Sequence, residues 1–115
     1  MAYTNNAGNM YQDIKITNGA SDSEVIDLRG VTFTGFITPA ALTGSSVSFL
    51  GSLDNTNFYL VRKPDGAEQS VTLNGAGIYK VSPADFLGVT FLKIRSNAAE
   101  AAERQLVAIS GDYTE

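Results

Sequence analysis

The chain has 115 residues, enough for one domain that buries a core without covalent crosslinks. It contains no cysteine and no histidine, which excludes disulfides, thiolate catalysis, the serine–histidine–aspartate triad and the usual zinc ligands. The formal net charge is −4, and the eight Lys and Arg residues are scattered singly, so there is no basic stripe for nucleic acid. No apolar run approaches the roughly 20 residues of a membrane span. We therefore expect a protein that is not an enzyme and that has no cofactor, nucleic-acid or membrane partner.

The N-terminal residues 1–10 are polar and rich in asparagine, without alternation of apolar side chains. They also lack the cationic and apolar regions of a signal peptide, so we expect synthesis in a cytoplasm. We predict an N-terminal arm over residues 1–10 that does not pair with the domain. Residues 11–115 are predicted to form a single β-sandwich domain.

Alternating apolar and polar residues separated by turn signals predict about nine strands in the rest of the chain. Asn18-Gly19 and Lys63-Pro64-Asp65-Gly66 are strong turn signals between them. The alanine-rich segment 97–103 is too short for a stable helix and is predicted to be a loop. The predicted strands cover residues 11–17, 24–28, 31–37, 46–52, 58–62, 69–73, 78–81, 89–96 and 104–110.

One pattern occurs twice, at residues 37–44 and 81–88. In each copy a strand ends on a hydroxyl residue and a proline, followed by a short apolar turn and a glycine. A hydroxyl residue before proline is typical of a helix N-terminus, so we predict a short helical plug in both places. A plug between two strands is a way to cross from one sheet to another, and two such crossovers indicate internal pseudo-symmetry.

These elements predict an all-β fold, a jelly-roll-like two-sheet β-sandwich, with a small β-barrel as the alternative. The residues placed on the inner face by strict alternation are the predicted core: Phe33, Ile37, Val47, Phe49, Leu92, Ile94 and Val107.

The candidate catalytic and metal-binding residues all have an ordinary structural explanation. Asp22, Glu24 and Asp27 are close enough in sequence to pair for glycosidic acid–base chemistry, but acids at a turn are common. The segment 54–57 (Asp-Asn-Thr-Asn) resembles part of a calcium loop but lacks its glycine and distal glutamate, so its side chains are expected to bond their own backbone. The Gly-rich segment 75–77 is predicted to be a turn and not a phosphate loop. The sequence thus predicts no catalytic, cofactor-binding or metal-binding residue.

Partner binding is the remaining possibility, and two groups of residues are candidates for it. Tyr3, Met10 and Tyr11 lie in or beside the arm, and tyrosine is enriched at interfaces. Three apolar residues lie on otherwise polar strand faces, where they either form a patch that meets a partner or are buried by a loop. They are Phe36, Leu50 and Phe91.

Several short segments follow one another in a characteristic order: Gly30-Val31-Thr32-Phe33, residues 38–44, 47–54 and 58–61, and again Gly88-Val89-Thr90-Phe91. This order resembles that of the small β-sandwich structural proteins of tailed bacteriophages. The resemblance covers about residues 25–110. It implies a non-enzymatic virion protein, of the capsid decoration (cement) type, on the outer surface of the head. It also implies the major capsid protein or another virion protein as partner, and a homotrimer as the favoured homo-oligomer.

Two alternatives of a different kind remain open. One is a tail or head-fibre accessory module. The other is a glycan-binding β-sandwich for host attachment, for which the five tyrosines and the Asn-rich loops are suited, although the chain has no tryptophan.

Overall fold

The computed structural model describes the backbone of residues 3–6 and 9–111 and the side chains of residues 11–111. This part of the chain forms ten strands and one short 3₁₀ helix. In chain order they are β1 (Tyr3–Asn6), β2 (Asn9–Ile16), β3 (Ile26–Asp27), β4 (Thr32–Thr38), β5 (Ser46–Ser52), β6 (Tyr59–Leu60), β7 (Ser70–Thr72), β8 (Gly77–Lys80), η1 (Pro83–Phe86), β9 (Phe91–Ser96) and β10 (Arg104–Gly111).

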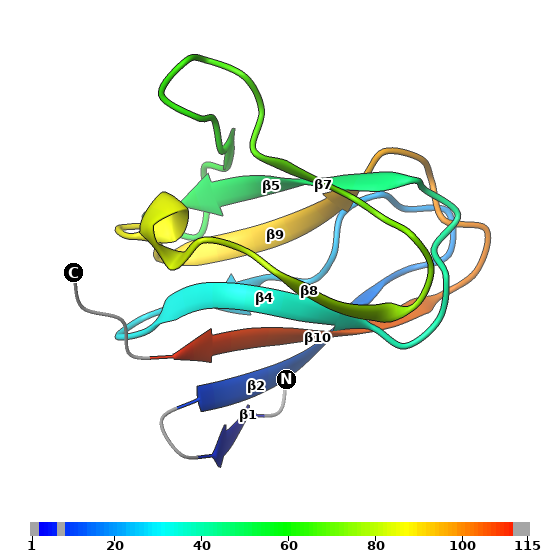
Figure 1. Ribbon diagram of the computed structural model, residues 1–115, viewed down its shortest axis with the longest axis horizontal. Coiled ribbons are helices and arrows are strands. Elements are labelled where there is room, and N and C mark those ends of the chain that lie inside the picture. Colours follow the sequence, from blue (N-terminus) through cyan, green and yellow to red (C-terminus); the bar gives the residue numbers. More distant parts are fainter. Residues whose placement is uncertain (1–2, 7–8, 112–115) are drawn as a thin grey trace.

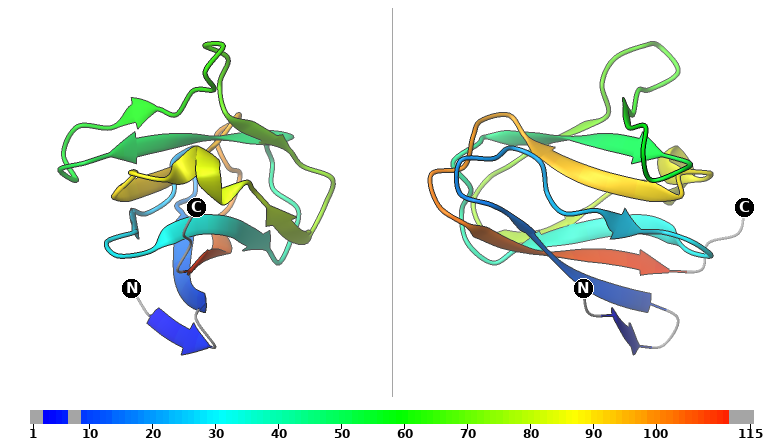
Figure 2. Two further views of the ribbon diagram at one scale, coloured as in Figure 1. Left: turned by 60° about the vertical axis from the view of Figure 1, so that its left-hand side comes forward. Right: turned by 180° about the vertical axis from the view of Figure 1, so that it is seen from behind.

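The strands form two antiparallel sheets that stack face to face (Figures 1 and 2). Sheet A has the order β1-β2-β10-β4-β8, and sheet B has the order β3-β9-β5-β6, with β7 also paired to β5. From β2 onward the chain changes sheet at every connection except those from β5 to β6 and from β6 to β7, as in a jelly roll. The predicted two-sheet sandwich is confirmed, and the alternative of a closed barrel is not adopted.

Both predicted crossovers are present and both lead from sheet A to sheet B. One joins β4 to β5 and the other joins β8 to β9. In addition β4 pairs with β8, and β5 pairs with β9, so the two copies of the repeated pattern lie side by side in antiparallel orientation. This arrangement agrees with the predicted internal pseudo-symmetry.

The two plugs differ in their local structure. The second is the predicted helical turn, η1, whose N-cap residue Ser82 makes no side-chain capping bond. The first contains only bends, so the prediction of a helix there was wrong. The reason is that the amides of Thr43 and Gly44 are held by the side chain of Glu100, which fixes the turn in another shape.

All nine predicted strands are present, although two of them shorten to the two-residue strands β3 and β6. Residues 97–103 form a loop, as predicted. The expectation that the N-terminal residues remain unpaired was wrong, because β1 pairs with β2 from Tyr3 opposite Gln12 to Asn6 opposite Asn9. Backbone hydrogen bonds make this hairpin, and they require no apolar alternation. β2 begins at Asn9 and runs through the predicted boundary between residues 10 and 11.

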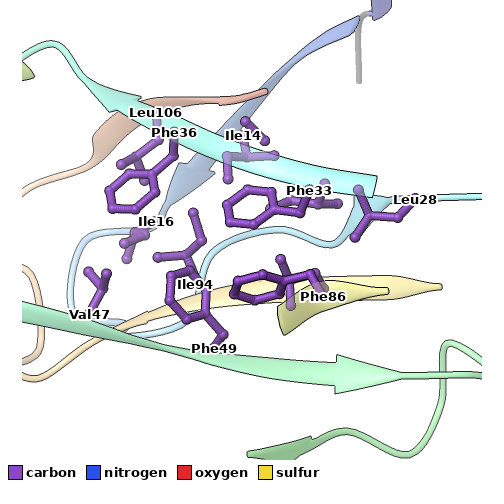
Figure 3. Packing of buried hydrophobic residues seen from close by; sticks show 13 residues of the cluster. Ile14, Ile16, Leu28, Phe33, Phe36, Val47, Phe49, Phe86, Ile94 and Leu106 are labelled. Carbon is purple, nitrogen blue, oxygen red and sulfur yellow. The ribbon is translucent and has the colours of Figure 1, made fainter. Parts of the chain in front are cut away.

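Four phenylalanine rings fill the space between the sheets (Figure 3). The ring of Phe49 lies 5.7 Å from that of Phe33 and 5.1 Å from that of Phe86, both edge-on. Phe86 comes from η1, so the second plug closes one end of the core. Five of the seven predicted core residues are confirmed as buried: Phe33, Val47, Phe49, Leu92 and Ile94.

A β-bulge in β4 explains one of the two core errors. Gly35 lies opposite Ile109 and Phe33 lies opposite Ser110, which leaves Thr34 as an extra residue. A bulge breaks the alternation of faces. Phe36 therefore joins Phe33 in the core, and Ile37 turns to the outer face, where it is half-buried.

The second error concerns β10, where Val107 was expected in the core. The structure buries Leu106 and Ala108 and turns Val107 and Ile109 to the outer face of sheet A. Residues 106–109 are all apolar, so alternation cannot decide which face is inside.

A buried carboxylate stabilises the end of the sandwich where β5 and β10 begin. Glu100 is 1% exposed. Its side chain accepts hydrogen bonds from the amides of Thr43 (2.8 Å) and Gly44 (3.1 Å), from the hydroxyl of Ser96 (2.7 Å) and from Nε of Arg104 (2.9 Å). It therefore joins the first plug, the end of β9 and the start of β10. Burial raises the pKa of Glu100, but these four bonds outweigh burial and lower the pKa from 4.5 to about 2.

The backbone of Glu100 extends the same cluster to a fourth segment. Its carbonyl accepts from the amide of Gly19 (2.8 Å), and its amide donates to the carbonyl of Ala20 (2.9 Å). Gly44 is required at this point, because an added Cβ would overlap the Ser96 hydroxyl and the Asn97 side chain.

Phe49→Ala is expected to lower the free energy of unfolding by about 3–5 kcal/mol, since it empties a site bounded by other rings. Ile37→Ala is the control and should cost only about 1 kcal/mol, because Ile37 is half-buried on the outer face. Urea unfolding of both variants measures the difference. Equal losses would contradict the bulge assignment.

Stability should depend on pH through Glu100. Its folded pKa lies below its unfolded value, so its contribution is complete above pH 4.5 and is lost as the pH falls toward 2. The loss amounts to about 3 kcal/mol. Glu100→Gln should cost about 2–4 kcal/mol at pH 7, because an amide cannot accept all four donors, and should flatten the stability curve in that pH window.

Urea unfolding across this pH range tests the dependence on Glu100. Glu103→Gln is the matched control, since Glu103 is exposed and forms only a 3.8 Å ion pair with Lys15. A Glu100→Gln protein with unchanged pH dependence would contradict the role assigned to Glu100.

Candidate functional site

The three apolar residues predicted as a partner patch do not lie together. Phe36 is fully buried in the core on sheet A, whereas Leu50 and Phe91 belong to sheet B. The three residues therefore do not form one patch, and the other possibility, burial, applies to Phe36 and Leu50. The physical reason for Phe36 is the bulge in β4 described above.

Leu50 and Phe91 lie on the outer side of sheet B beside polar chains. Leu50 is 7% exposed, does not belong to the core cluster, and lies opposite Lys93 and Leu60 in the sheet. Phe91 is half-buried, with the guanidinium of Arg29 5.7 Å from its ring centre. Asp27 accepts hydrogen bonds from the Arg29 side chain, which lowers the pKa of Asp27. Phe91 is thus partly covered by its own chain.

Of the three residues in or beside the predicted arm, the side chains of Tyr3 and Met10 lie outside the described residues. Their backbones belong to β1 and β2. Tyr11 is described and lies on β2 opposite Ile109.

The outer face of sheet A carries a continuous apolar surface. Two rows of residues cross the sheet. In one, Ile78, Ile37 and Val107 follow one another from β8 through β4 to β10. In the other row, Ile109 on β10 is followed by Tyr11 on β2. Ile78 is 62% exposed, and the rest are half-buried. We call these five residues the sheet A face.

A hollow of about 540 Å³ opens in the sheet A face. It is lined on the apolar side mainly by Tyr11, Ile37, Ile78 and Ile109, and Lys80 also borders it. Exposed charges stand at both margins, Lys80 on β8 and Asp13 on β2. An apolar centre with a charged rim is the usual anatomy of a protein interface.

A second hollow, of about 440 Å³, lies at the end of β5. Its base is Gly51, where an added Cβ would lie 3.2 Å from Val89 and 3.3 Å from Val61. Leu53 and Tyr59 line it and are 76% and 71% exposed. We call it the β5-end hollow.

The segment 54–57 borders the β5-end hollow and is held by Asp54. One carboxylate oxygen accepts from the amides of Thr56 and Asn57, both at 2.9 Å, and from the hydroxyl of Ser52 at 3.0 Å. The other accepts from the Asn57 side chain at 2.8 Å. The backbone hydrogen bonds, followed by those of the side chains, keep the pKa of Asp54 well below its usual range. The predicted bonding of this segment to its own backbone is confirmed.

The acidic residues considered for acid–base chemistry, Asp22, Glu24 and Asp27, each make structural contacts instead. Asp22 forms an ion pair with Arg95 (2.8 Å), and this bond raises the pKa of Arg95. Glu24 accepts from the amide of Lys15 at 3.1 Å. Asp22 and Arg95 line a third, polar hollow of about 670 Å³ on sheet B.

The described residues lack two further features. No group of three or more acidic side chains there is arranged to hold a metal ion. No helix in the same residues has the length and apolar character of a membrane span.

Sequence reasoning missed the sheet A face and the β5-end hollow. The run of four apolar residues at 106–109 was the available signal for the first, since a strand with one solvated face alternates. The second had no signal, because Gly51 and Val89 approach each other only in the folded chain.

The chain matches no protein-family profile and no curated protein sequence. Among solved structures it is similar to CBM32-1 from a family 31 glycoside hydrolase of Clostridium perfringens. The two share 12% sequence identity with a TM-score of 0.42, over 91% of this chain and 76% of the other.

Proposed function

We propose that this protein is a non-enzymatic accessory protein of a bacteriophage virion, of the capsid decoration type, that attaches through the sheet A face. The phage context comes from the sequence resemblance. The mode of attachment comes from the geometry of sheet A.

The observation that carries the proposal is the apolar character of both faces of β10. Leu106 and Ala108 fill the core, while Val107 and Ile109 continue the apolar surface outside. A strand in the middle of an antiparallel sheet needs only one apolar face for folding. The outer apolar residues are therefore available for a partner, and with Ile78 they form one connected surface.

The partner is another virion protein, in the first place the major capsid protein. We expect the docking surface of that partner to have an apolar centre that fills the hollow between Ile37, Ile78 and Ile109. Its charges complement Lys80 at one margin of the sheet A face and Asp13 at the other. The homotrimer implied by the resemblance stays a prediction, as does the location in the virion.

The test is attachment of an altered protein to particles that lack their own copy. Ile78→Lys places a charge at the β8 end of the apolar row, beside the hollow, and should reduce occupancy on washed particles by about tenfold. Its unfolding free energy should change by less than about 0.5 kcal/mol, because Ile78 is mostly exposed.

Thr72→Lys is the matched control, since it adds the same charge to an exposed position on β7 in sheet B. It should bind particles like the unaltered protein. Full occupancy by the Ile78→Lys protein would exclude the sheet A face, and absence of the unaltered protein from washed particles would exclude the virion role.

A further inference from the structure

The β5-end hollow is separate from the sheet A face. It lies on sheet B, between the end of β5, β6 and the residue Val89 that follows η1. Its volume of about 440 Å³ is in the range of small-molecule sites.

The hollow has a rigid apolar base. Tyr59 is paired with Gly51 across the sheet, which fixes the backbone of both. Next to them, the amide of Val61 donates to the carbonyl of Phe49 at 2.8 Å, and the amide of Thr90 donates to that of Ser52 at 3.2 Å. The walls thus belong to strands and their direct continuations, so the shape exists before any ligand binds.

Two large apolar side chains project from this base. Leu53 and Tyr59 are among the most exposed large hydrophobic residues of the described chain. A tyrosine ring in this position offers a flat apolar surface and a hydroxyl that remains in water. Neither residue contributes to the buried core, so folding does not explain them.

The rim of the hollow is polar and rigid. Asp54 and Asn57 hold each other through their side chains, and Asp54 also binds two backbone amides. Oδ2 of Asp54 accepts one hydrogen bond, from the side-chain amide of Asn57, whereas Oδ1 accepts three. A carboxylate oxygen has about two acceptor positions, which leaves the first with capacity for a hydroxyl donor.

We propose that the β5-end hollow binds a neutral saccharide, with the apolar face of one pyranose ring on Tyr59 and its hydroxyl groups at Asp54 and Asn57. A pyranose combines an apolar C–H face with a rim of hydroxyl donors and acceptors, which matches a flat ring beside a fixed carboxylate and amide. The ionised Asp54 disfavours anionic ligands. This site gives a specific form to the glycan-binding alternative, and it does not depend on attachment to a virion.

The experiment uses the purified full chain. The protein is applied to an array of neutral oligosaccharides that contain hexoses and N-acetylhexosamines. The oligosaccharide that binds best is then titrated into the protein by calorimetry. Tyr59→Ala should weaken binding of that ligand by at least about tenfold, whereas Tyr59→Phe, which keeps the ring, should stay within about threefold. Asp54→Asn should weaken binding and should also loosen the segment 54–57, which proton exchange of the Thr56 amide reports.

Ile78→Ala is the matched control, because it removes an exposed apolar side chain on the other sheet. It should bind the saccharide like the unaltered protein. An array without binding would overturn the proposal, and so would binding that Tyr59→Ala leaves unchanged. Neither result bears on particle attachment, which is measured with Ile78→Lys.

Discussion

The fold depends on the bonding of one carboxylate, that of Glu100. A sandwich with crossovers must bring together turns that are far apart in sequence, and here residues 19–20, 43–44, 96 and 104 all bond to the same residue. Loop closures of this kind carry an entropic cost that increases with chain length between the contacts. The buried Glu100 carboxylate accepts hydrogen bonds from several of these segments at once, which offsets this cost where they meet. The same charge would be strongly destabilising if any of these segments moved away.

The two ends of the sandwich consequently have different physical characters. β5 begins beside the cluster around Glu100, where Asn97 donates to the carbonyl of Ser46. It ends at Ser52, beside the exposed Tyr59 and the segment held by Asp54. One end is stabilised by buried polar contacts, and the other presents apolar side chains to solvent. β5 connects the two ends, and its residue Gly51 forms the base of the β5-end hollow.

The sequence predicted the number, order and sheet-crossing of the strands because turn residues and alternation are local signals. It did not predict which face of β4 beyond Thr34, or of β10, is inside. A bulge depends on the register of two strands, and Leu106 to Ile109 have no polar residue to mark the outer side. The candidate sites were harder still. The threonine neighbours of Phe36 could not decide between an exposed patch and burial, and the structure buries it. The β5-end hollow is built from segments that meet only in space.

The repeated crossovers have a consequence for the integrity of the chain. Phe33 and Phe49 come from β4 and β5, which flank the first copy of the pattern, and Phe86 lies within the second copy. Their rings pack on one another. The repeat is therefore not a pair of subdomains, since neither half has a core of its own. The loop between β6 and β7 joins the halves, projects from sheet B and is mostly exposed (Figure 1). A protease that cuts there would separate the chain into two pieces that remain held together by the aromatic core and by the β5–β9 and β4–β8 pairs.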